Sequence, residues 1–185
     1  MSCRALALVL ACSFAALTGC VDNSGGPAPE GTELEEFSPA AGDAGGLFCE
    51  FFRDDAFLLV DRAAVEDFFA NECAGNEAAV EDELATIADG LEEGEALVVV
   101  SIQLGGCLGE WGVHGFYESE DGSTVTAWVL RADSSYGRTN WACTDDIGGA
   151  IGVYRVMGAA DATEADIVIG TYNPDLPGAP AQPGQ

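Results

Sequence analysis

Few side chains in this sequence are of a type that performs catalysis in a recognisable arrangement. His114 is the only histidine among 185 residues, and no serine beyond the N-terminal region lies in a G-x-S-x-G motif. A general base needs a nucleophile or a metal as its partner, and the sequence supplies neither at a known spacing. We therefore expect no catalytic residue and interpret His114 as a structural or surface histidine.

Four cysteines, Cys49, Cys73, Cys107 and Cys143, follow the N-terminal region. An even number of cysteines is typical of exported domains that are stabilised by disulfides. Among the pairings that four cysteines allow, we favour Cys49–Cys73 and Cys107–Cys143, each stabilising the fold by about 2–4 kcal/mol. The alternative is a zinc site built from the four thiolates. Because the sequence contains no C-x-x-C motif, we expect no metal ligand.

The 32 acidic residues offer many carboxylates but no recognisable motif. Calcium needs about six to eight oxygens that converge on one point, and the spacing of an EF-hand loop is absent. A pair of glycosidase carboxylates depends on geometry that a sequence does not give. We therefore interpret the acids as a solvated surface.

The most distinctive short segment is 105–112, which is rich in glycine and contains a tryptophan. Glycine permits tight turns and the close approach of another backbone, and a tryptophan can anchor a peptide or a sugar. We therefore name Gly106, Trp111 and His114 as a candidate binding loop. The alternative is a loop held by a disulfide, with its tryptophan packed in the core.

The N-terminus has the layout of a secretory signal. Arg4 precedes an apolar stretch over 5–17. This stretch is too short for a membrane-spanning helix, which needs about 20 apolar residues. The residues that follow, Leu17-Thr18-Gly19-Cys20, resemble the lipobox of bacterial lipoproteins. That resemblance implies cleavage before Cys20 and acylation of its thiol and its new amine, which together anchor a protein stably in a membrane. The alternative is an ordinary cleaved signal whose cysteine joins a disulfide.

The residue after the candidate lipidation site indicates in which membrane the protein is anchored. Val21 stands where an aspartate would resemble the inner-membrane retention signal of enteric bacteria. In a host with two membranes we therefore expect the outer membrane, with the protein facing the periplasm.

The charge of the chain excludes two classes of partner. The formal net charge is −26, and all basic residues are arginines. Such a surface repels a phosphate backbone and anionic lipid headgroups, so we expect no nucleic acid and no headgroup patch as partners. Disorder throughout the chain is excluded as well, because 48% of the residues are hydrophobic.

Composition divides the chain into four parts. Residues 1–19 are the predicted signal peptide, and 20–46 are the lipidated cysteine and a flexible acidic tether rich in Gly, Pro and Ala. Residues 47–172 are expected to form one globular domain, which is long enough for a substantial core. Residues 173–185 are a tail of Pro and Gly that is not expected to pack.

Hydrophobic spacing predicts two helices followed by strands. Asp61 can cap a helix over 62–72, and a second helix is predicted to begin at Asn76 and to end at Gly90. The nearly continuous apolar run 97–102 predicts a buried central strand. Further strands are predicted within 48–60 and over 111–117, 124–130, 150–157 and 165–172, with Asp121-Gly122 in a hairpin turn. We therefore expect an α+β fold in which the two N-terminal helices pack on a mostly antiparallel sheet of about five strands, with two disulfides.

The region from Ala96 to about Val156 resembles the PrcB C-terminal-like domain, which is named after a protease-complex protein and occurs in bacterial lipoproteins. In that family a strand ends in a glycine-rich turn and leads into strands of a small sheet. The matching positions here are the strand 97–104, the turn 105–112, the hairpin 113–130 and the strand 150–157, with the helix 62–72 before them. The turn lacks the tyrosine of the family. The resemblance implies a stabilising role toward another exported protein, without catalysis.

These features predict a membrane-anchored, extracytoplasmic bacterial lipoprotein of the cell envelope. Its expected role is that of a non-catalytic protein-interaction or accessory module, with another envelope protein as the partner and no cofactor. The alternative is a lipoprotein that binds a small ligand, a glycan or calcium with Trp111 and nearby acids. An enzyme is the third class of function, and a buried His114 beside two acids would favour it.

Overall fold

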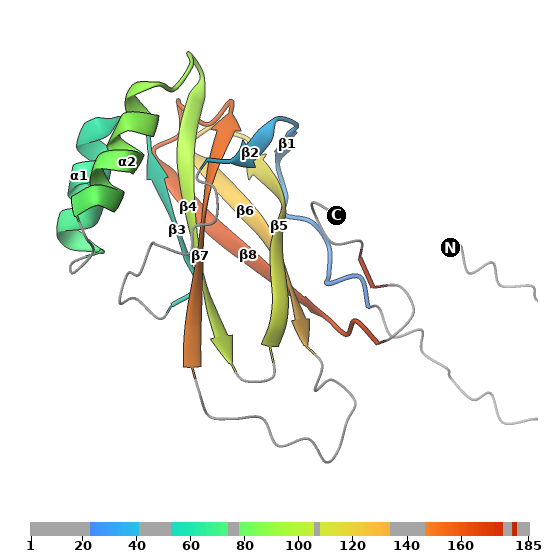
Figure 1. Ribbon diagram of the computed structural model, residues 1–185. Helices are drawn as coiled ribbons and strands as arrows, with labels where there is room; N and C mark the ends of the chain where they lie inside the picture. Colours follow the sequence, from blue (N-terminus) through green and yellow to red (C-terminus); the bar gives the residue numbers. More distant parts are fainter. Residues whose placement is uncertain are drawn as a thin grey trace, which may run out of the picture.

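Two β-sheets dominate the architecture (Figure 1). The computed structural model describes residues 23–40, 53–73, 78–105, 108–133, 147–175 and 179–180. Sheet A has the strand order β1 (Thr32–Leu34), β5 (Leu108–Glu118), β6 (Thr124–Asp133) and β8 (Glu164–Tyr172). Sheet B has the order β2 (Phe37–Pro39), β7 (Ile147–Met157), β4 (Glu95–Gly105) and β3 (Asp55–Leu59). Two helices, α1 (Arg62–Asn71) and α2 (Ala78–Asp89), cover one face of sheet B.

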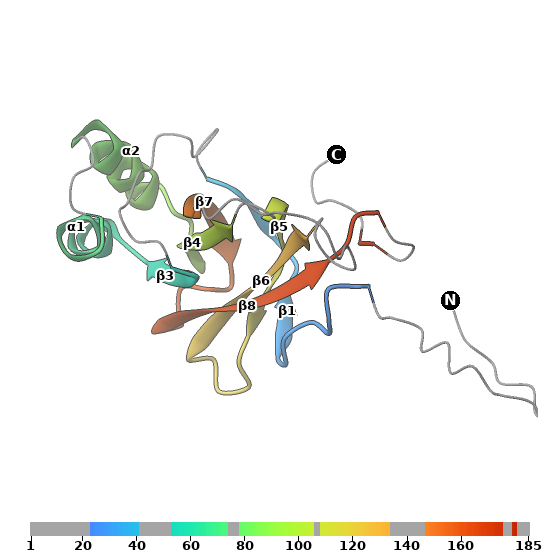
Figure 2. The ribbon, with the colours of Figure 1, turned by 90° about the horizontal axis from the view of Figure 1, so that it is seen from below.

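All neighbouring strands pair antiparallel except β6 and β8, which are parallel. The longest ladder joins β4 to β7, from Glu95 opposite Met157 to Gly105 opposite Ile147. Edge strands β3 and β8 lie close together on one side of the molecule, where the two sheets approach each other. The structure is therefore a sandwich with helices on one outer face (Figure 2).

The strand β4 forms the middle layer of the molecule. Val98 and Val100 belong to the apolar cluster between the two sheets, whereas Leu97 and Val99 pack against the helices. All four side chains are 0% exposed. Because successive side chains of a strand point to opposite faces, a strand covered on both faces must be apolar at nearly every position. The prediction of a buried central strand over 97–102 is confirmed.

The helix α1 begins where the sequence predicts. The Oδ1 atom of Asp61 accepts a hydrogen bond from the backbone N–H of Ala64 at 2.8 Å, so Asp61 is the N-cap. One face of α1 carries Val65, Phe68 and Phe69, which are buried against sheet B. Phe68 contacts Phe57 of β3 with a ring-centroid distance of 5.1 Å.

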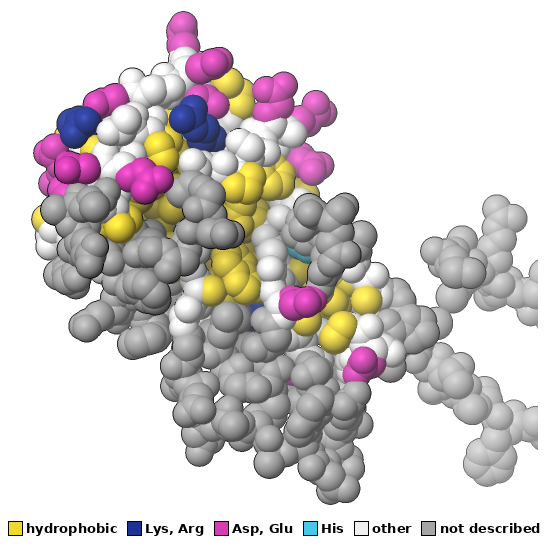
Figure 3. All heavy atoms as spheres, viewed as in Figure 1, with side chains coloured by type: hydrophobic (Ala, Val, Ile, Leu, Met, Phe, Trp, Pro, Cys, Tyr) yellow, Lys and Arg dark blue, Asp and Glu magenta, His cyan; other side chains and the backbone are white. Residues whose placement is uncertain are grey.

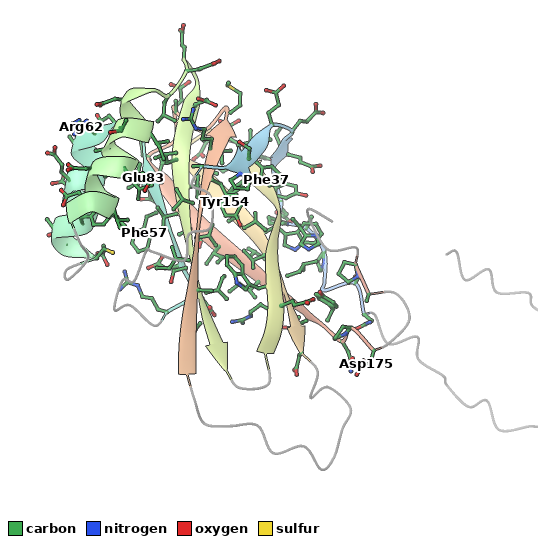
Figure 4. The ribbon with its side chains drawn as sticks, in the orientation of Figure 1. Phe37, Phe57, Arg62, Glu83, Tyr154 and Asp175 are labelled. Atoms are coloured by element: carbon green, nitrogen blue, oxygen red, sulfur yellow. The ribbon has the colours of Figure 1, made fainter. Side chains whose placement is uncertain are left out.

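Part of the segment that the sequence assigns to a flexible tether belongs to the two sheets. β1 pairs with the end of β5, and β2 pairs with the end of β7. Phe37 of β2 contacts the ring of Phe116 at 5.2 Å and that of Tyr154 at 6.3 Å (Figure 4). Strands of three residues leave no period in a sequence, and their stability comes from the sheet edges that they complete.

The predicted fold class is wrong. The protein is mostly β, with two sheets of four strands instead of one sheet of about five, and the helices cover only one of the sheets. The sequence shows that β4 and β5 follow each other but not that the chain changes sheets between them, because alternation of apolar residues looks the same in either sheet. Cys73 is the only cysteine among the described residues, so neither of the two predicted disulfides can be seen complete.

Cys73 is 1% exposed and is disulfide-bonded. The other cysteines of the two predicted disulfides, Cys49, Cys107 and Cys143, lie outside the described residues. The pairings Cys49–Cys73 and Cys107–Cys143 therefore stay predictions.

Candidate functional site

Two of the three residues of the candidate binding loop, Trp111 and His114, lie on β5. The strands β4 and β5 extend into the predicted glycine-rich turn, and Gly106 lies outside the described residues. Trp111 of β5 packs against the apolar cluster between the sheets. His114 lies at an irregularity of β5 and has Trp128 as a ring neighbour, at 5.8 Å between centroids. Trp111 therefore has the packing role that we gave as the alternative.

Within the part of the chain that the structure describes, His114 has no partner that would make it a general base. Its side chain forms no hydrogen bond or ion pair with the described part of the chain, and no carboxylate pair lies beside it there. Burial lowers the pKa of His114 below its usual value, so the ring is neutral at pH 7. A neutral imidazole can accept a proton, but the two acids that would favour an enzyme do not lie beside His114 within the described ranges, and the expectation of no catalysis stays a prediction.

The described residues show neither a cluster that could hold a metal ion nor a helix that could span a membrane. Within the described ranges, no group of three or more His, Cys, Asp or Glu side chains is placed to hold a metal ion. No helix in those ranges combines the length and the apolar character needed to cross a bilayer. Cys20 and the residues before it lie outside the described part of the chain, so lipidation stays a prediction.

The structure has a hollow of about 490 Å³ that sequence reasoning missed. It lies between α1, β3 and the beginning of β8. Its floor is formed by the run 56–59 of β3 together with Phe68 and Ala165. Its rim carries the polar residues Asp67, Asn71, Glu72, Thr163 and Glu164. We call this hollow the α1–β3 groove.

The floor of the α1–β3 groove includes a strand at the edge of a sheet. Among the described strands, β3 forms backbone pairs only with β4 and is the last strand of sheet B. The opposite wall begins at Glu164, where β8 forms the edge of sheet A. A strand edge carries backbone N–H and C=O groups that can pair with another extended chain.

The electrostatics of the α1–β3 groove are acidic. Arg53 binds the carboxylates of Asp55 at 2.6 Å and Glu72 at 2.8 Å, which offsets one of the two negative charges at that end of the groove. No ion pair within the described residues involves Asp67 or Glu164. These two carboxylates leave a negative rim above an apolar floor, and this arrangement favours a ligand that carries positive charge.

The α1–β3 groove depends on contacts between distant parts of the sequence. Asp67 and Asn71 lie one turn apart on α1, next to Phe68. Their spacing in the sequence already places these two polar residues on one face of the helix. Nothing in the sequence shows that the beginning of β8 lies beside α1. The groove therefore could not be predicted, although the helix that forms its wall was.

Comparison of the chain with protein-family models, with curated proteins and with solved structures finds no match. The resemblances to a lipobox and to the PrcB C-terminal-like domain therefore stay predictions.

Proposed function

We propose that the protein is a lipid-anchored, non-catalytic interaction module of the bacterial cell envelope, which binds an extended segment of another exported protein in the α1–β3 groove. The lipobox-like residues that end in Cys20 support the anchor. The single observation that supports the binding role is the edge strand β3, which forms the floor of a hollow of about 490 Å³.

An extended segment fits the α1–β3 groove by main-chain pairing. A strand that adds to a sheet edge gains backbone hydrogen bonds along its length, and the surrounding surface selects alternate side chains. Residues 56–59 of β3 line the groove and β8 approaches the same strand, so the pairing is confined to this stretch. The apolar side chains of the segment would contact Leu58, Phe68 and Ala165.

The charge of the groove indicates the chemistry of the segment. Asp67 and Glu164 face a partner across the rim, and the whole chain carries a formal net charge of −26. A segment that alternates basic and apolar residues complements both the rim and the floor. An acidic segment would be repelled.

A volume of this size also suits a small ligand, since such pockets span about 300–1,000 Å³. The strand edge favours a peptide, because a small ligand has no use for a row of backbone groups. Trp111 packs partly buried against the apolar cluster between the sheets, which favours the peptide over our glycan alternative.

The binding role is tested with defined peptides. We expect a fluorescent peptide of alternating lysine and valine to bind the purified protein saturably, as measured by anisotropy. The same peptide with proline in place of valine should not bind, because proline has no N–H for the strand edge. Equal binding of both peptides would show attraction by charge alone and would overturn the proposal.

A pair of neighbouring variants supplies the control. Asp67→Lys reverses a charge on the rim of the groove, whereas Glu66→Lys reverses an exposed charge next to it that is not part of the lining. We expect Asp67→Lys to abolish peptide binding and Glu66→Lys to keep most of it. Equal effects of the two changes would locate the binding elsewhere.

The anchor is tested separately. We expect Cys20→Ala to release the protein from the membrane fraction. If the variant is processed and still sediments with membranes, the lipoprotein interpretation is wrong. Intact mass of the wild-type protein should show the added acyl chains.

A further inference from the structure

The structure fixes the chain to the sandwich immediately after the predicted lipidation site. We infer that the sandwich lies directly against the membrane at the end where β6 and β8 finish, and that the α1–β3 groove faces away from the bilayer. This inference rests on the lipidation of Cys20 proposed above. The inference goes beyond lipidation because it assigns a membrane-facing surface to the folded unit.

The attachment begins with a pair of asparagines. The Nδ2 atom of Asn23 donates to the carbonyl oxygen of Asn173 at 2.9 Å, and the Oδ1 atom of Asn23 accepts from the N–H of Asn173 at 2.7 Å. Asn23 is 7% exposed and Asn173 is 3% exposed. Two hydrogen bonds between buried groups hold the chain at this point, because breaking them would leave buried polar atoms unpaired. We call this pair the asparagine clamp.

The residues after the asparagine clamp continue the attachment. The backbone of Gly25 lies against Gly170 of β8 so closely that a Cβ atom on Gly170 would collide with the Gly25 carbonyl oxygen. The segment then reaches β1, which pairs with β5 at Glu118. The chain is therefore held from Asn23 onward and does not act as a free spacer there.

The length of chain before the clamp limits how far the sandwich can stand from its anchor. Only Val21 and Asp22 separate Cys20 from Asn23. Three residue steps span at most about 11 Å when fully extended. A bilayer has an interfacial layer of roughly 5–8 Å on each side of its hydrocarbon core. The asparagine clamp must therefore lie at or just above the headgroups.

The position of the clamp determines which surface faces outward. The helices and the segment that begins at Asn23 lie on opposite sides of the sandwich in both ribbon views (Figures 1 and 2). Asp175 lies near the clamp and Glu83 lies on α2 at the far side (Figure 4). The α1–β3 groove lies beside α1, so it is presented away from the membrane.

The charge distribution agrees with this orientation. On the face shown in Figure 3, acidic side chains gather over the helices and the neighbouring turns. A protein with a formal net charge of −26 is repelled by anionic headgroups. Contact with the bilayer therefore depends on the covalent anchor and the asparagine clamp, and in this orientation the acidic helices point outward.

The inference is tested by energy transfer on vesicles. The lipidated protein is labelled with a donor at Asp175→Cys or at Glu83→Cys, two exposed acidic positions, and is reconstituted into phosphatidylcholine vesicles with a headgroup-labelled acceptor. We expect strong transfer from position 175 and weak transfer from position 83. Equal transfer from the two positions would overturn the inference.

Two further variants keep the result specific. A Gly-Ser spacer of about 20 residues between Val21 and Asp22 keeps the clamp and frees the sandwich, so transfer from position 175 should fall to the level of position 83. Asn23→Ala opens the clamp but leaves the contact of Gly25 with Gly170, so it should lower the transfer from position 175 less than the spacer does. If neither change lowers the transfer, the short link from Cys20 to the asparagine clamp does not hold the sandwich against the membrane.

The same samples separate this inference from the proposed function. Intact mass and flotation with vesicles report lipidation independently of orientation. A protein without acyl chains would overturn the lipoprotein proposal, and with it the premise of the inference. A lipidated protein that floats but shows equal transfer would overturn the orientation alone.

Discussion

At the scale of single residues, Phe116 connects the two sheets near their β1–β2 side. Its side chain is 0% exposed and contacts the rings of Phe37 at 5.2 Å and Tyr154 at 5.6 Å. We expect Phe116→Ala to lower the free energy of unfolding by about 3–5 kcal/mol, as measured by urea unfolding, because it leaves a cavity between the sheets. Phe37→Ala should cost less than half of that, since Phe37 is 36% exposed. Equal costs would contradict the burial that we describe.

The hairpin turn between β5 and β6 depends on one carboxylate. Three hydrogen bonds reach the Oδ1 atom of Asp121, from Ser123 Oγ at 2.7 Å, Ser123 N at 3.0 Å and Ser119 Oγ at 2.8 Å. The bonds from Ser123, and then the one from Ser119, lower the pKa of Asp121 from 3.8 to about 2. The charged form is therefore the stabilised form of this group.

The pH dependence of the Asp121 turn follows from that shift. A carboxyl with a lowered pKa contributes stability that is fully present above its unfolded-state pKa of 3.8 and is lost as the pH falls through about 2. We expect Asp121→Ala to lower the free energy of unfolding at pH 7, and the difference from wild type to shrink as the pH falls from 4 to 2. Glu120→Ala is the neighbouring control. An NMR titration of Asp121 with a midpoint near 3.8 would contradict this account.

At the scale of elements, α1 depends on its N-cap. Asp61 is exposed and accepts from Ala64 N, so it serves the first turn of the helix and not the core. We expect Asp61→Ala to lower the free energy of unfolding by about 1 kcal/mol, measured by chemical denaturation. Asp61→Asn should have little effect, because asparagine is an equally good N-cap. A similar loss in the free energy of unfolding for both variants would indicate that Asp61 stabilises the helix through its charge and not through capping.

The helix pair is also held by an ion pair across its surface. Arg62 of α1 binds the carboxylate of Asp89 at the end of α2. The hydrogen bond with Asp89 raises the pKa of Arg62, and the bond with Arg62 lowers the pKa of Asp89. Both side chains are exposed, so the pair orients the helices and contributes little stability. The apolar contacts of Phe68 and Leu84 with sheet B are what hold the helix layer.

At the scale of the whole molecule, the net charge opposes the folded state. A formal net charge of −26 on a compact chain repels itself, and salt screens this repulsion over a Debye length of about 10 Å at 0.1 M. We expect the Tm to rise by roughly 2–4 °C when NaCl is increased from about 10 to about 150 mM, as measured by scanning calorimetry. An uncharged osmolyte at the same osmolality should cause a smaller rise. A constant or falling Tm would show that attractive ion pairs outweigh the repulsion.

Several parts of the fold were predictable from the sequence, because they depend on neighbouring residues. The cap at Asp61, the helix that follows it and the turn at Gly122, where φ is +71°, all result from local interactions. The run 97–102 was predictable as well, since a strand covered on both faces has to be apolar throughout.

The rest was decided by tertiary structure. The sequence determined which segments form α1, α2 and the long strands, since period and capping are properties of the segment itself. It did not determine that β5 and β6 leave the sheet of β4, that β1 and β2 complete sheet edges, or that Glu164 and Asp67 line the same groove. Alternating apolar residues show that a strand has a buried face but not which sheet it faces, and that choice depends on the total apolar surface that the whole molecule buries. The lipobox-like residues that end in Cys20 are recognisable in the sequence and do not depend on folding. The α1–β3 groove and the asparagine clamp form only when distant segments pack together.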